Sequence, residues 1–398
     1  MTSPSSALSW RLLAVLSLLM GFAAISTDFY LPAMPAMARS LHASPEALAL
    51  TISGFLAGFS VGQLFWGPIG DRFGRRIPIA CGLVLFIIGS LGCALSSSIT
   101  IMIGWRVVQA IGACASVVLA RAMVRDLYEG SRATAMMSHL MTITAATPLL
   151  APTVGGQILV FGGWRSIFTV LTVIGVLIFG LLFTLPETFP PERRHHEPLA
   201  RVFAHYKDLL LQPRLIGYAG AGGCLYAGMF AYISGSPAAY INYYHVSPSY
   251  YGLLFGLNIV GIMGANAINA RLAHRLGSDR LLTLGGGLAI LSALVLAVTG
   301  GIGWGGLWGL AIPLFFYTAT SGFIVANSLT GALHQHPRHA GAVSALVGAV
   351  HYGSGILGSA LVGVFADGTP RPMTAIILGF SLLSVFFLLL LKAPQKMT

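Results

Sequence analysis

Charged side chains are scarce in this chain: they make up 8 % of its 398 residues, whereas hydrophobic residues make up 56 %. A water-facing surface normally needs about a quarter charged residues, so a soluble fold is excluded. Most side chains must face lipid, where every backbone polar group needs a partner within the protein. Only helices or closed barrels meet that need, and apolar runs of about 20 residues favour helices.

Cysteines and catalytic motifs are also few. Cys81, Cys93, Cys114 and Cys224 all lie inside apolar runs without metal-ligand spacing, so we expect no metal site and no disulfide framework. The chain has no G-x-S-x-G, H-E-x-x-H or phosphate-binding loop. We therefore expect no enzyme activity and no cofactor. An ion gradient or a downhill substrate must then supply the energy, unless a partner supplies ATP.

What the chain does contain is a long series of apolar spans. They predict an all-α membrane protein with twelve transmembrane helices in two pseudo-symmetric six-helix bundles. We place the bundles at residues 1–186 and 214–398, joined by a polar cytoplasmic linker over 187–213. The predicted spans are 10–37, 47–69, 77–96, 100–123, 133–161, 163–185, 214–242, 249–271, 280–299, 305–331, 340–366 and 372–391.

The distribution of basic residues predicts the orientation of these spans. Of the 22 Lys and Arg residues, eighteen lie at one set of span ends, three at the other, and Arg106 lies inside a span. The positive-inside rule then places both termini in the cytoplasm, with the chain crossing the membrane many times. It also accounts for the net charge of +11 without a nucleic-acid partner. We expect a monomer in the lipid bilayer.

A weak internal repeat supports a duplicated unit. Residues 71–76, which follow the second span, resemble residues 270–275, which follow the eighth span. The two segments are 199 positions apart, about half the chain. A duplicated six-helix unit is typical of transporters with two pseudo-symmetric halves.

The strongest motif lies between the second and third spans, in the sequence GPIGDRFGRR over residues 67–76. It resembles the major facilitator superfamily signature G-x-x-x-D-R-x-G-R-R/K. The matching positions are Gly67, Asp71, Arg72, Gly74, Arg75 and Arg76. Glycine allows a tight turn, and an acid among arginines can join a charge network. The resemblance implies that this network latches the cytoplasmic side while the transporter faces outward.

Two further motifs resemble the same superfamily. Arg106 begins the fourth-span segment RVVQAIG, and an arginine inside a span is a functional candidate by default. The alternative is a structural arginine bound by backbone carbonyls. In the fifth span, Pro152, Gly155 and Gly156 match the antiporter motif G-P-x-x-G-G, but Ala151 replaces its leading glycine. A purely structural kink is the alternative for that segment.

Asp28 is the one acid that we place inside a span, away from helix ends. Desolvation disfavours the charged form of a carboxyl group, so a buried aspartate can exchange protons in the working range. We therefore predict that Asp28 is the proton site and that Arg106 modulates it electrostatically. The rival interpretation is an acid in water at a helix end, because Asp28 lies in the outer part of the first span.

Several segments narrow the resemblance to one branch of the superfamily. They are residues 27–35 (TDFYLPAMP), Arg125-Asp126 after the fourth span, and Pro186-Glu187-Thr188 after the sixth. Together they resemble the Bcr/CflA branch of drug:proton antiporters, the bicyclomycin and chloramphenicol resistance group. This resemblance implies drug export driven by proton entry, with small-molecule drugs and protons as partners.

In that architecture, spans 1, 4, 7 and 10 surround a central cavity. The candidate lining residues on those spans are Tyr30, Gln109, Tyr226, Met229, Phe230, Tyr232, Phe316, Tyr317 and Asn327. Aromatic and methionine side chains suit bulky, mostly apolar ligands of varied shape. For each of these residues, packing or contact with lipid is the alternative.

The resulting prediction is a secondary antiporter that exports amphipathic drugs across the inner membrane by alternating access. One alternative is a proton-coupled carrier of a native metabolite, such as a sugar or small peptide, on the same fold. Another is a membrane enzyme or receptor that transports nothing. The absence of a catalytic motif and of a sizeable soluble domain disfavours the latter.

Overall fold

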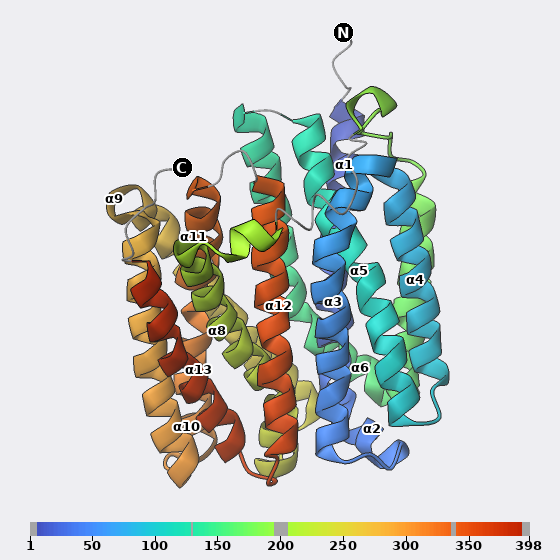
Figure 1. Cartoon of the computed structure of the whole chain (residues 1–398). Coiled ribbons are helices and arrows are strands. Elements are labelled where there is room, and N and C mark those ends of the chain that lie inside the picture. Colours follow the sequence, from blue (N-terminus) through green and yellow to red (C-terminus); the bar gives the residue numbers. More distant parts are fainter. Residues whose placement is uncertain (1–5, 129, 195–205, 336–339, 392–398) are drawn as a thin grey trace.

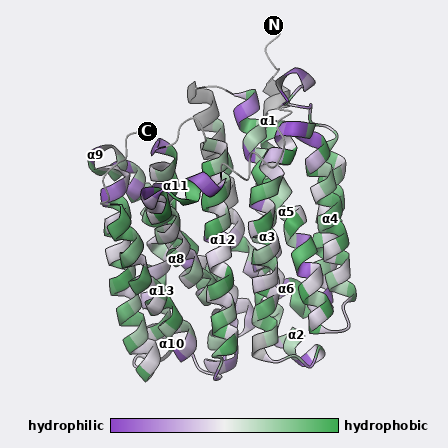
Figure 2. Ribbon diagram, viewed as in Figure 1, coloured by the Kyte–Doolittle hydropathy of each residue, from purple (hydrophilic) through white to green (hydrophobic). Residues whose placement is uncertain are grey.

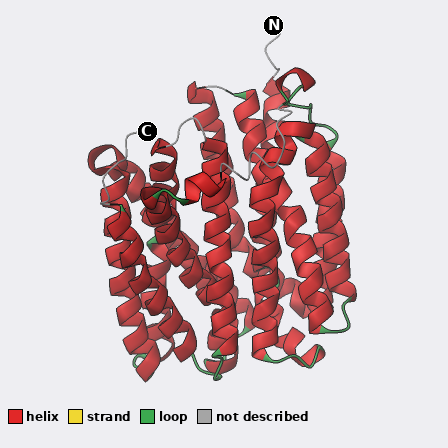
Figure 3. Ribbon diagram, in the orientation of Figure 1, coloured by secondary structure: helices red, strands yellow, loops and turns green. Residues whose placement is uncertain are grey.

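A computed structural model describes residues 6–128, 130–194, 206–335 and 340–391. Within these ranges every regular element is a helix, as Figure 3 shows, and there is no strand. This agrees with the all-α membrane fold that the scarcity of charge predicts.

The first half of the molecule consists of helices α1 to α6. Its elements are α1 (Ser6–Asp28), η1 (Leu31–Ala33), α2 (Met34–Ser40), α3 (Pro45–Phe73), α4 (Arg76–Leu95), α5 (Ile99–Leu127) and α6 (Gly130–Leu182). Helix α6 is two spans in one, because Gly163 breaks its helical geometry with φ 74°.

The second half runs from α8 to α13. The short helix η2 (Pro191–Arg193) precedes α8 (Pro213–Pro237), η3 (Ala238–Tyr243), α9 (Pro248–Ile302), α10 (Gly306–Ala319), α11 (Ser321–Gln335), α12 (Ala340–Val364) and α13 (Arg371–Leu390). Gly277, with φ 72°, divides α9 into two spans. Helices α10 and α11 follow each other closely and fill the region of the predicted tenth span.

Ten helical stretches within the described residues are long and apolar enough to cross a membrane. One of them, Thr147–Leu182, contains the Gly163 break and so carries parts of two predicted spans. Helix α8 is 25 residues long but is not among the ten; its many glycines make it less apolar. With these two adjustments, the helices match the twelve predicted spans.

Local sequence explains where several helices begin. Ser44, Ser98 and Ser247 precede α3, α5 and α9, and each hydroxyl accepts a hydrogen bond from the backbone N–H three residues later. These bonds satisfy amide groups that a helix leaves unpaired in its first turn.

Helix α1 begins and α13 ends at the same end of the bundle, at the top of Figure 1. We call this the terminal end, and we call the opposite end, which carries α2, the distal end. Figure 2 shows hydrophilic residues gathered at the terminal end and apolar residues along the helices. This distribution agrees with the predicted concentration of basic residues beside the termini.

The two halves repeat the same turn at the terminal end, but not in the register that the sequence indicates. Gly74, between α3 and α4, has φ 88°, and Gly277, between the two spans of α9, has φ 72°. Positive φ is readily adopted only by glycine, so these two residues are equivalent. They are 203 positions apart, and the predicted offset of 199 is therefore wrong by about one helical turn. The segment HRLG that ends at Gly277 is the counterpart of DRFG.

Helices α3 and α12 form one long contact between the halves, and α6 and α9 form another. The Ser60 hydroxyl donates to the Ala349 carbonyl at 2.8 Å, and the Ser359 hydroxyl donates to the Ala49 carbonyl at 3.1 Å. Toward the distal end, a Cβ atom at Gly252 would lie 2.7 Å from the backbone nitrogen of Thr153. The halves are therefore tightly packed near the distal end.

Candidate functional site

Asp28 is the last residue of α1, and its side chain is only 5 % exposed. The helix stops there because the chain continues into η1, which contains Pro32 and is buried throughout. Proline provides no backbone N–H and so does not extend an α-helix. The rival interpretation is thus half right: Asp28 does end a helix, but it is buried and not in water.

The Asp28 carboxylate makes no hydrogen bond or ion pair with any residue that the structure describes. Its charge lies within electrostatic range of the hydroxyls of Tyr232, Tyr251 and Tyr352. These tyrosines come from α8, α9 and α12, and η1, which follows Asp28, packs against α8 and α9, so Asp28 lies beside the second half. An isolated carboxylate in such surroundings is costly in its charged form.

Arg106 lies in the same region and is fully buried. Its Nη1 donates to the Ser26 carbonyl at 3.0 Å and to Gln109 Oε1 at 2.6 Å. The guanidinium carbon lies 4.4 Å from the ring centroids of both Tyr30 and Phe55. Such cation–π contacts compensate in part for lost hydration.

Arg106 and Asp28 do not form an ion pair. They are linked through α1 instead, because Arg106 binds the Ser26 carbonyl two residues before Asp28. This contact agrees with the alternative interpretation of Arg106 as a structural arginine that backbone carbonyls bind. Electrostatic modulation of Asp28 by Arg106 stays a prediction.

The segment that resembles the antiporter motif packs α6 against both halves. A Cβ atom at Gly155 would collide with the Phe29 carbonyl oxygen, and one at Gly156 would lie 3.2 Å from the Pro248 carbonyl oxygen. Pro152 is buried within α6. The glycines therefore allow α6 to lie directly beside the chain that follows Asp28 and beside the start of α9.

The two candidate lining residues of the first half have partners within that half. Tyr30 is fully buried, with its hydroxyl 3.2 Å from Thr51 Oγ1. The Gln109 amide nitrogen donates to the Ser90 hydroxyl at 2.8 Å. Both side chains hold the surroundings of Arg106 in place.

Four candidates on α8 lie close to the boundary between the halves or to Asp28. Tyr226 and Phe230 have ring centroids 5.4 and 6.3 Å from that of Tyr352 in α12. Met229 is half-buried beside them, and the Tyr232 hydroxyl accepts a hydrogen bond from Asn258 Nδ2 at 2.7 Å. Tyr226, Phe230 and Tyr352 form a cluster that we call the aromatic cluster.

Two aromatic members of these surroundings, Phe59 and Tyr352, were not predicted from the sequence. The ring of Phe59 in α3 lies 4.4 Å from that of Tyr352, which joins the aromatic cluster to the first half. His351 is stacked on Tyr226 with ring centroids 4.7 Å apart, and its Nε2 lies 3.2 Å from the Ser328 hydroxyl. No motif marks these residues. The adjacent rings of His351 and Tyr352 within an apolar span are only a weak indication of a functional position.

The candidates on α10 and α11 are elsewhere. Phe316 is 57 % exposed, and its ring contacts the neighbouring Phe315. Tyr317 is buried inside the second half against Gly228. Asn327 donates to Asn269 Oδ1 at 2.6 Å and so joins α11 to α9. In this structure these three side chains do not lie beside the aromatic cluster, and their role in lining a substrate cavity stays a prediction.

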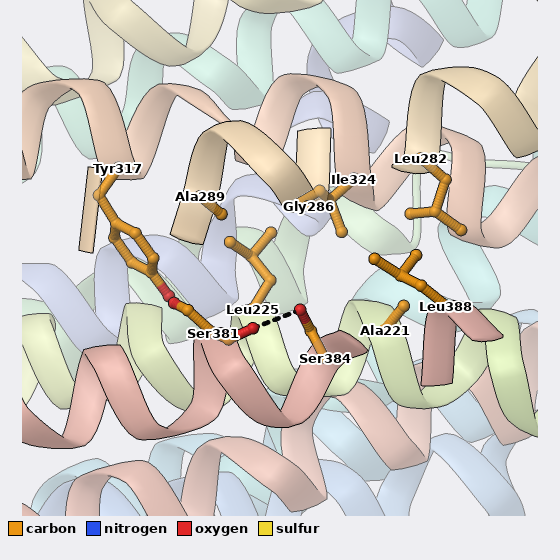
Figure 4. A pocket seen from close by; sticks show the side chains of 10 residues that line it. All are labelled: Ala221, Leu225, Leu282, Gly286, Ala289, Tyr317, Ile324, Ser381, Ser384 and Leu388. Carbon is orange, nitrogen blue, oxygen red and sulfur yellow. Dashed lines mark hydrogen bonds between the residues drawn. The ribbon is translucent and has the colours of Figure 1, made fainter. Parts of the chain in front are cut away.

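Figure 4 shows Tyr317 and Ser381 at a cavity between α8, α9, α10, α11 and α13. Its volume is about 10 Å³, which is room for roughly one water molecule. This space is too small for a drug, and in this structure Tyr317 packs inside the second half.

The signature motif forms a charge network at the terminal end. Arg75 donates to Asp71 Oδ1 at 2.7 Å and to Asp126 Oδ2 at 2.8 Å. Burial lowers the pKa of Arg75, but its hydrogen bonds to Asp126 and Asp71 raise that pKa by more, so the guanidinium stays charged. The contacts of Arg75 with Asp71 and Asp126 join α3, α4 and α5 within the first half.

Glu187 and Thr188 complete this network, which is a role that their sequence motif does not reveal. The Glu187 carboxylate accepts from the backbone N–H of Arg75 at 2.9 Å and of Arg76 at 3.1 Å. It thereby caps the start of α4, where the helix dipole favours negative charge. The Thr188 hydroxyl donates to Asp126 Oδ2 at 3.2 Å.

The remaining motif positions act locally. Gly74 makes the turn with positive φ, and Gly67 has open space around it. Arg76 donates to the Phe183 carbonyl at 2.9 Å, whereas Arg72 is exposed above the ring of Phe73. Only part of the motif therefore belongs to the charge network.

Comparison with known proteins identifies relatives over nearly the whole chain. The family described as Major Facilitator Superfamily matches residues 16–359. An uncharacterized MFS-type transporter, YdgK of Bacillus subtilis, is 37 % identical over 91 % of each chain. A bicyclomycin resistance protein homolog of Haemophilus influenzae is 32 % identical, covering 91 % of this chain and 90 % of its own. A chloramphenicol resistance protein of Pseudomonas aeruginosa is 29 % identical, covering 94 % and 92 %.

Solved structures share the fold at low sequence identity. The xylose transporter XylE of E. coli, in a partially occluded inward open conformation, superposes with a TM-score of 0.76 at 16 % identity, covering 99 % of this chain and 100 % of its own. A bacterial homolog of the lysosomal transporter Spinster, in an inward-facing conformation, gives 0.75 at 16 % identity, covering 98 % and 97 %. At this identity the likeness concerns the fold alone.

Proposed function

Since the chain belongs to the major facilitator superfamily, in the branch of the bicyclomycin and chloramphenicol resistance proteins, we propose that it exports amphipathic drugs in exchange for protons. The similarity to bicyclomycin and chloramphenicol resistance proteins supports drugs as the substrate class and does not favour a sugar carrier. We place the protein in the bacterial inner membrane, as a monomer with both termini in the cytoplasm.

One observation carries the proton coupling in this proposal. Asp28 is a buried carboxylate without a partner among the described residues, and the chain that follows it packs against α8 and α9 of the second half. A group in such a place changes its charge when the halves separate and water reaches it. Movement of the halves and protonation of Asp28 are thereby coupled.

The cycle follows from this coupling. Drug binds near the aromatic cluster while the terminal end is open to the cytoplasm and Asp28 is deprotonated. The halves then rock, water reaches Asp28 from the distal side, and protonation of the carboxyl group helps to release the drug. The return movement carries the proton inward.

The contacts between the halves indicate which state of this cycle the structure represents. Near the distal end, Gly156 and Gly252 hold α6 against α9. At the terminal end, the charge network of Asp71, Arg75 and Asp126 stays within the first half. We assign the structure to a state closed at the distal end. The network would act as a latch in the opposite state, when the terminal end closes.

Drug tolerance is the direct test of this function. The chain and its Asp28→Asn variant are expressed at equal levels in bacteria that lack their own efflux pumps, and growth is measured with bicyclomycin and chloramphenicol. We expect the chain to raise tolerance and the variant to lose that effect. Tolerance that the Asp28→Asn variant retains in full would exclude Asp28 as the proton site. If no drug has an effect, a carrier of a native metabolite becomes the better account.

A further inference from the structure

Pro68 interrupts the hydrogen bonds of α3 near the terminal end. Proline has no backbone N–H, so the carbonyl of Leu64, four residues earlier, lacks its usual helical donor. The Tyr206 hydroxyl donates to that carbonyl instead, with the two oxygens 3.2 Å apart. Tyr206 belongs to the linker between the halves and is only 5 % exposed. We call this hydrogen bond the anchor, because it binds the linker to the first half.

Prolines inside two helices of the second half are compensated in the same way. In α8, the carbonyl four residues before Pro237 accepts a hydrogen bond from the Ser236 hydroxyl at 3.4 Å. In α10, the carbonyl four residues before Pro313 accepts one from the Thr299 hydroxyl at 2.5 Å. Side-chain hydroxyls commonly bind carbonyls that proline leaves free in membrane helices. Of these three carbonyls, Leu64 alone receives its donor from the linker.

The linker segment that carries the anchor has one buried face. Residues 206–210 are helical, and Leu209 is 5 % exposed and belongs to the main hydrophobic core. Tyr206 and Leu209 are three positions apart, so they lie on the same side of this helical turn. Lys207 and Asp208 are exposed on its other side. The segment therefore packs on the protein through an apolar contact as well as the anchor.

The anchor lies where α3 and α12 separate toward the terminal end. The Ser60 hydroxyl donates to the Ala349 carbonyl, and a Cβ atom at Gly348 would lie 3.0 Å from Gln63 Oε1. One turn further along α3, Gly67 has open space around it. Since α3 and α12 belong to different halves, the linker is bound beside the point from which the halves open.

The anchor leaves only a short connection between the halves. Seven residue steps separate Tyr206 from Pro213, where α8 begins. Even a fully extended chain of that length spans at most about 25 Å. The helical residues 206–210 shorten it further, because a helix advances only about 1.5 Å per residue. While the anchor holds, α3 and the start of α8 cannot move far apart.

We propose that Tyr206 makes the linker a strap that limits how far the terminal end opens. Pro68 is part of this device, because it keeps the Leu64 carbonyl free to accept the hydroxyl. The strap need not be released when the terminal end closes, since closure brings the halves nearer to each other. This inference rests on the alternating access of the proposed function, and it requires no particular drug.

Trypsin cleavage after Lys207 tests the anchor, because a protease reaches this bond only when the segment leaves the protein surface. Purified full-length protein is digested briefly, and the fragments are quantified by mass spectrometry. Tyr206→Phe removes the donor, and we expect cleavage after Lys207 to become about threefold faster or more, as the loss of one hydrogen bond predicts. Cleavage after the exposed Arg280 should not change.

Tyr250→Phe is the matched control variant, because Tyr250 is 67 % exposed, and it should alter neither cleavage rate. Equal cleavage after Lys207 in the wild type and in Tyr206→Phe would overturn the proposal. An equal acceleration after Lys207 and Arg280 would also overturn it, since Tyr206 would then stabilise the whole fold and not the linker contact.

Pro68→Ala tests where the hydroxyl acts. Alanine restores an N–H that the Leu64 carbonyl binds within the helix, so the Tyr206 hydroxyl loses its acceptor. We expect Pro68→Ala alone to accelerate cleavage after Lys207, and Tyr206→Phe to add less than about twofold in that background. An undiminished effect of Tyr206→Phe in the Pro68→Ala protein would show that the hydroxyl does not act through Leu64, which would refute the anchor.

Distances between spin labels measure the opening itself. Labels are attached at Ile77→Cys in α4 and His334→Cys in α11, both exposed near the terminal end, in a variant whose four native cysteines are alanines. We expect Tyr206→Phe to extend the distance distribution toward longer separations. An unchanged distribution, with the linker released as judged by trypsin in the protein with native cysteines, would exclude a limit on opening. Neither measurement uses a drug, so a chain that confers no drug tolerance would still decide the proposal.

Discussion

At the scale of single residues, the molecule depends on charged groups that the fold keeps away from water. Asp28 and Arg106 illustrate two different solutions. Arg106 donates through Nη1 to a carbonyl and an amide and lies against two aromatic rings, although its Nε and Nη2 atoms have no hydrogen-bond partner among the described residues. Asp28 has no hydrogen bond or ion pair with a described residue, and a carboxyl group in that position can exchange a proton as its surroundings change.

Glu187 offers a prediction at this scale. Replacing it by glutamine removes the negative charge from the start of α4, where the backbone N–H groups of Arg75 and Arg76 bind it. We expect a loss of about 0.5–2 kcal/mol, seen as a lower midpoint of thermal unfolding. Glu192→Gln is the matched control, because Glu192 is exposed in the same connection. An equal shift for both variants would mean that Glu187 does not cap the helix.

Individual residues also show where the sequence is informative. A motif and its spacing pointed to Asp71 and Arg75, and Asp28 was noticed as the one acid inside a predicted span, because charge inside or beside an apolar span is rare. Hydropathy could not assign Phe316 and Tyr317 to one side of their helix, for a physical reason. Neighbouring residues on a helix point about 100° apart, and hydropathy within a span does not distinguish the side that faces lipid, protein or ligand.

At the scale of helices, close approach between backbones organises the distal end. Gly155 lies against the backbone of Phe29, immediately after Asp28, so α6 fixes the position of the end of α1. The sequence located the ends of α6 within a few residues, whereas the predicted span 10–37 runs nine residues past the end of α1 at Asp28. It did not reveal which helices touch, since glycine also occurs where nothing approaches it.

Gly155→Ala tests this contact. The added methyl group would collide with the Phe29 carbonyl, and overpacking of this kind costs about 1–3 kcal/mol. We expect a lower unfolding midpoint and a marked loss of drug export. Gly180→Ala, on the same helix with open space around it, should be neutral or slightly stabilising. Wild-type export by Gly155→Ala would show that the contact is not needed.

At the scale of the whole molecule, the two halves are held together by α3 with α12 and by α6 with α9. The repeat between the halves is visible in the sequence, but its register is not. Gly74 and Gly277 establish it through backbone conformation, whereas side chains such as Asp71 have diverged in the second half. Composition therefore predicted the architecture, whereas only the structure shows which helices of the two halves pack against each other.

Alternating access predicts that a covalent link at the distal end stops transport. The Cβ position of Gly156 lies 3.8 Å from the Ser249 Cα, close enough for a disulfide, which joins Cα atoms about 4.4–6.8 Å apart. We expect oxidation of the Gly156→Cys, Ser249→Cys double variant to block export and reduction to restore it. Each single variant serves as a control. Export that continues with the link fully formed would contradict rocking of the halves about this contact.

The most direct test of the central claim is proton movement in everted membrane vesicles that respiration has acidified. A pH-sensitive dye reports the interior while bicyclomycin or chloramphenicol is added to vesicles carrying either the wild-type chain or Asp28→Asn. We predict that drug triggers proton release in the wild type and none in the variant. Equal, drug-triggered proton release in both would contradict the assignment of Asp28 as the site that couples drug export to the proton gradient.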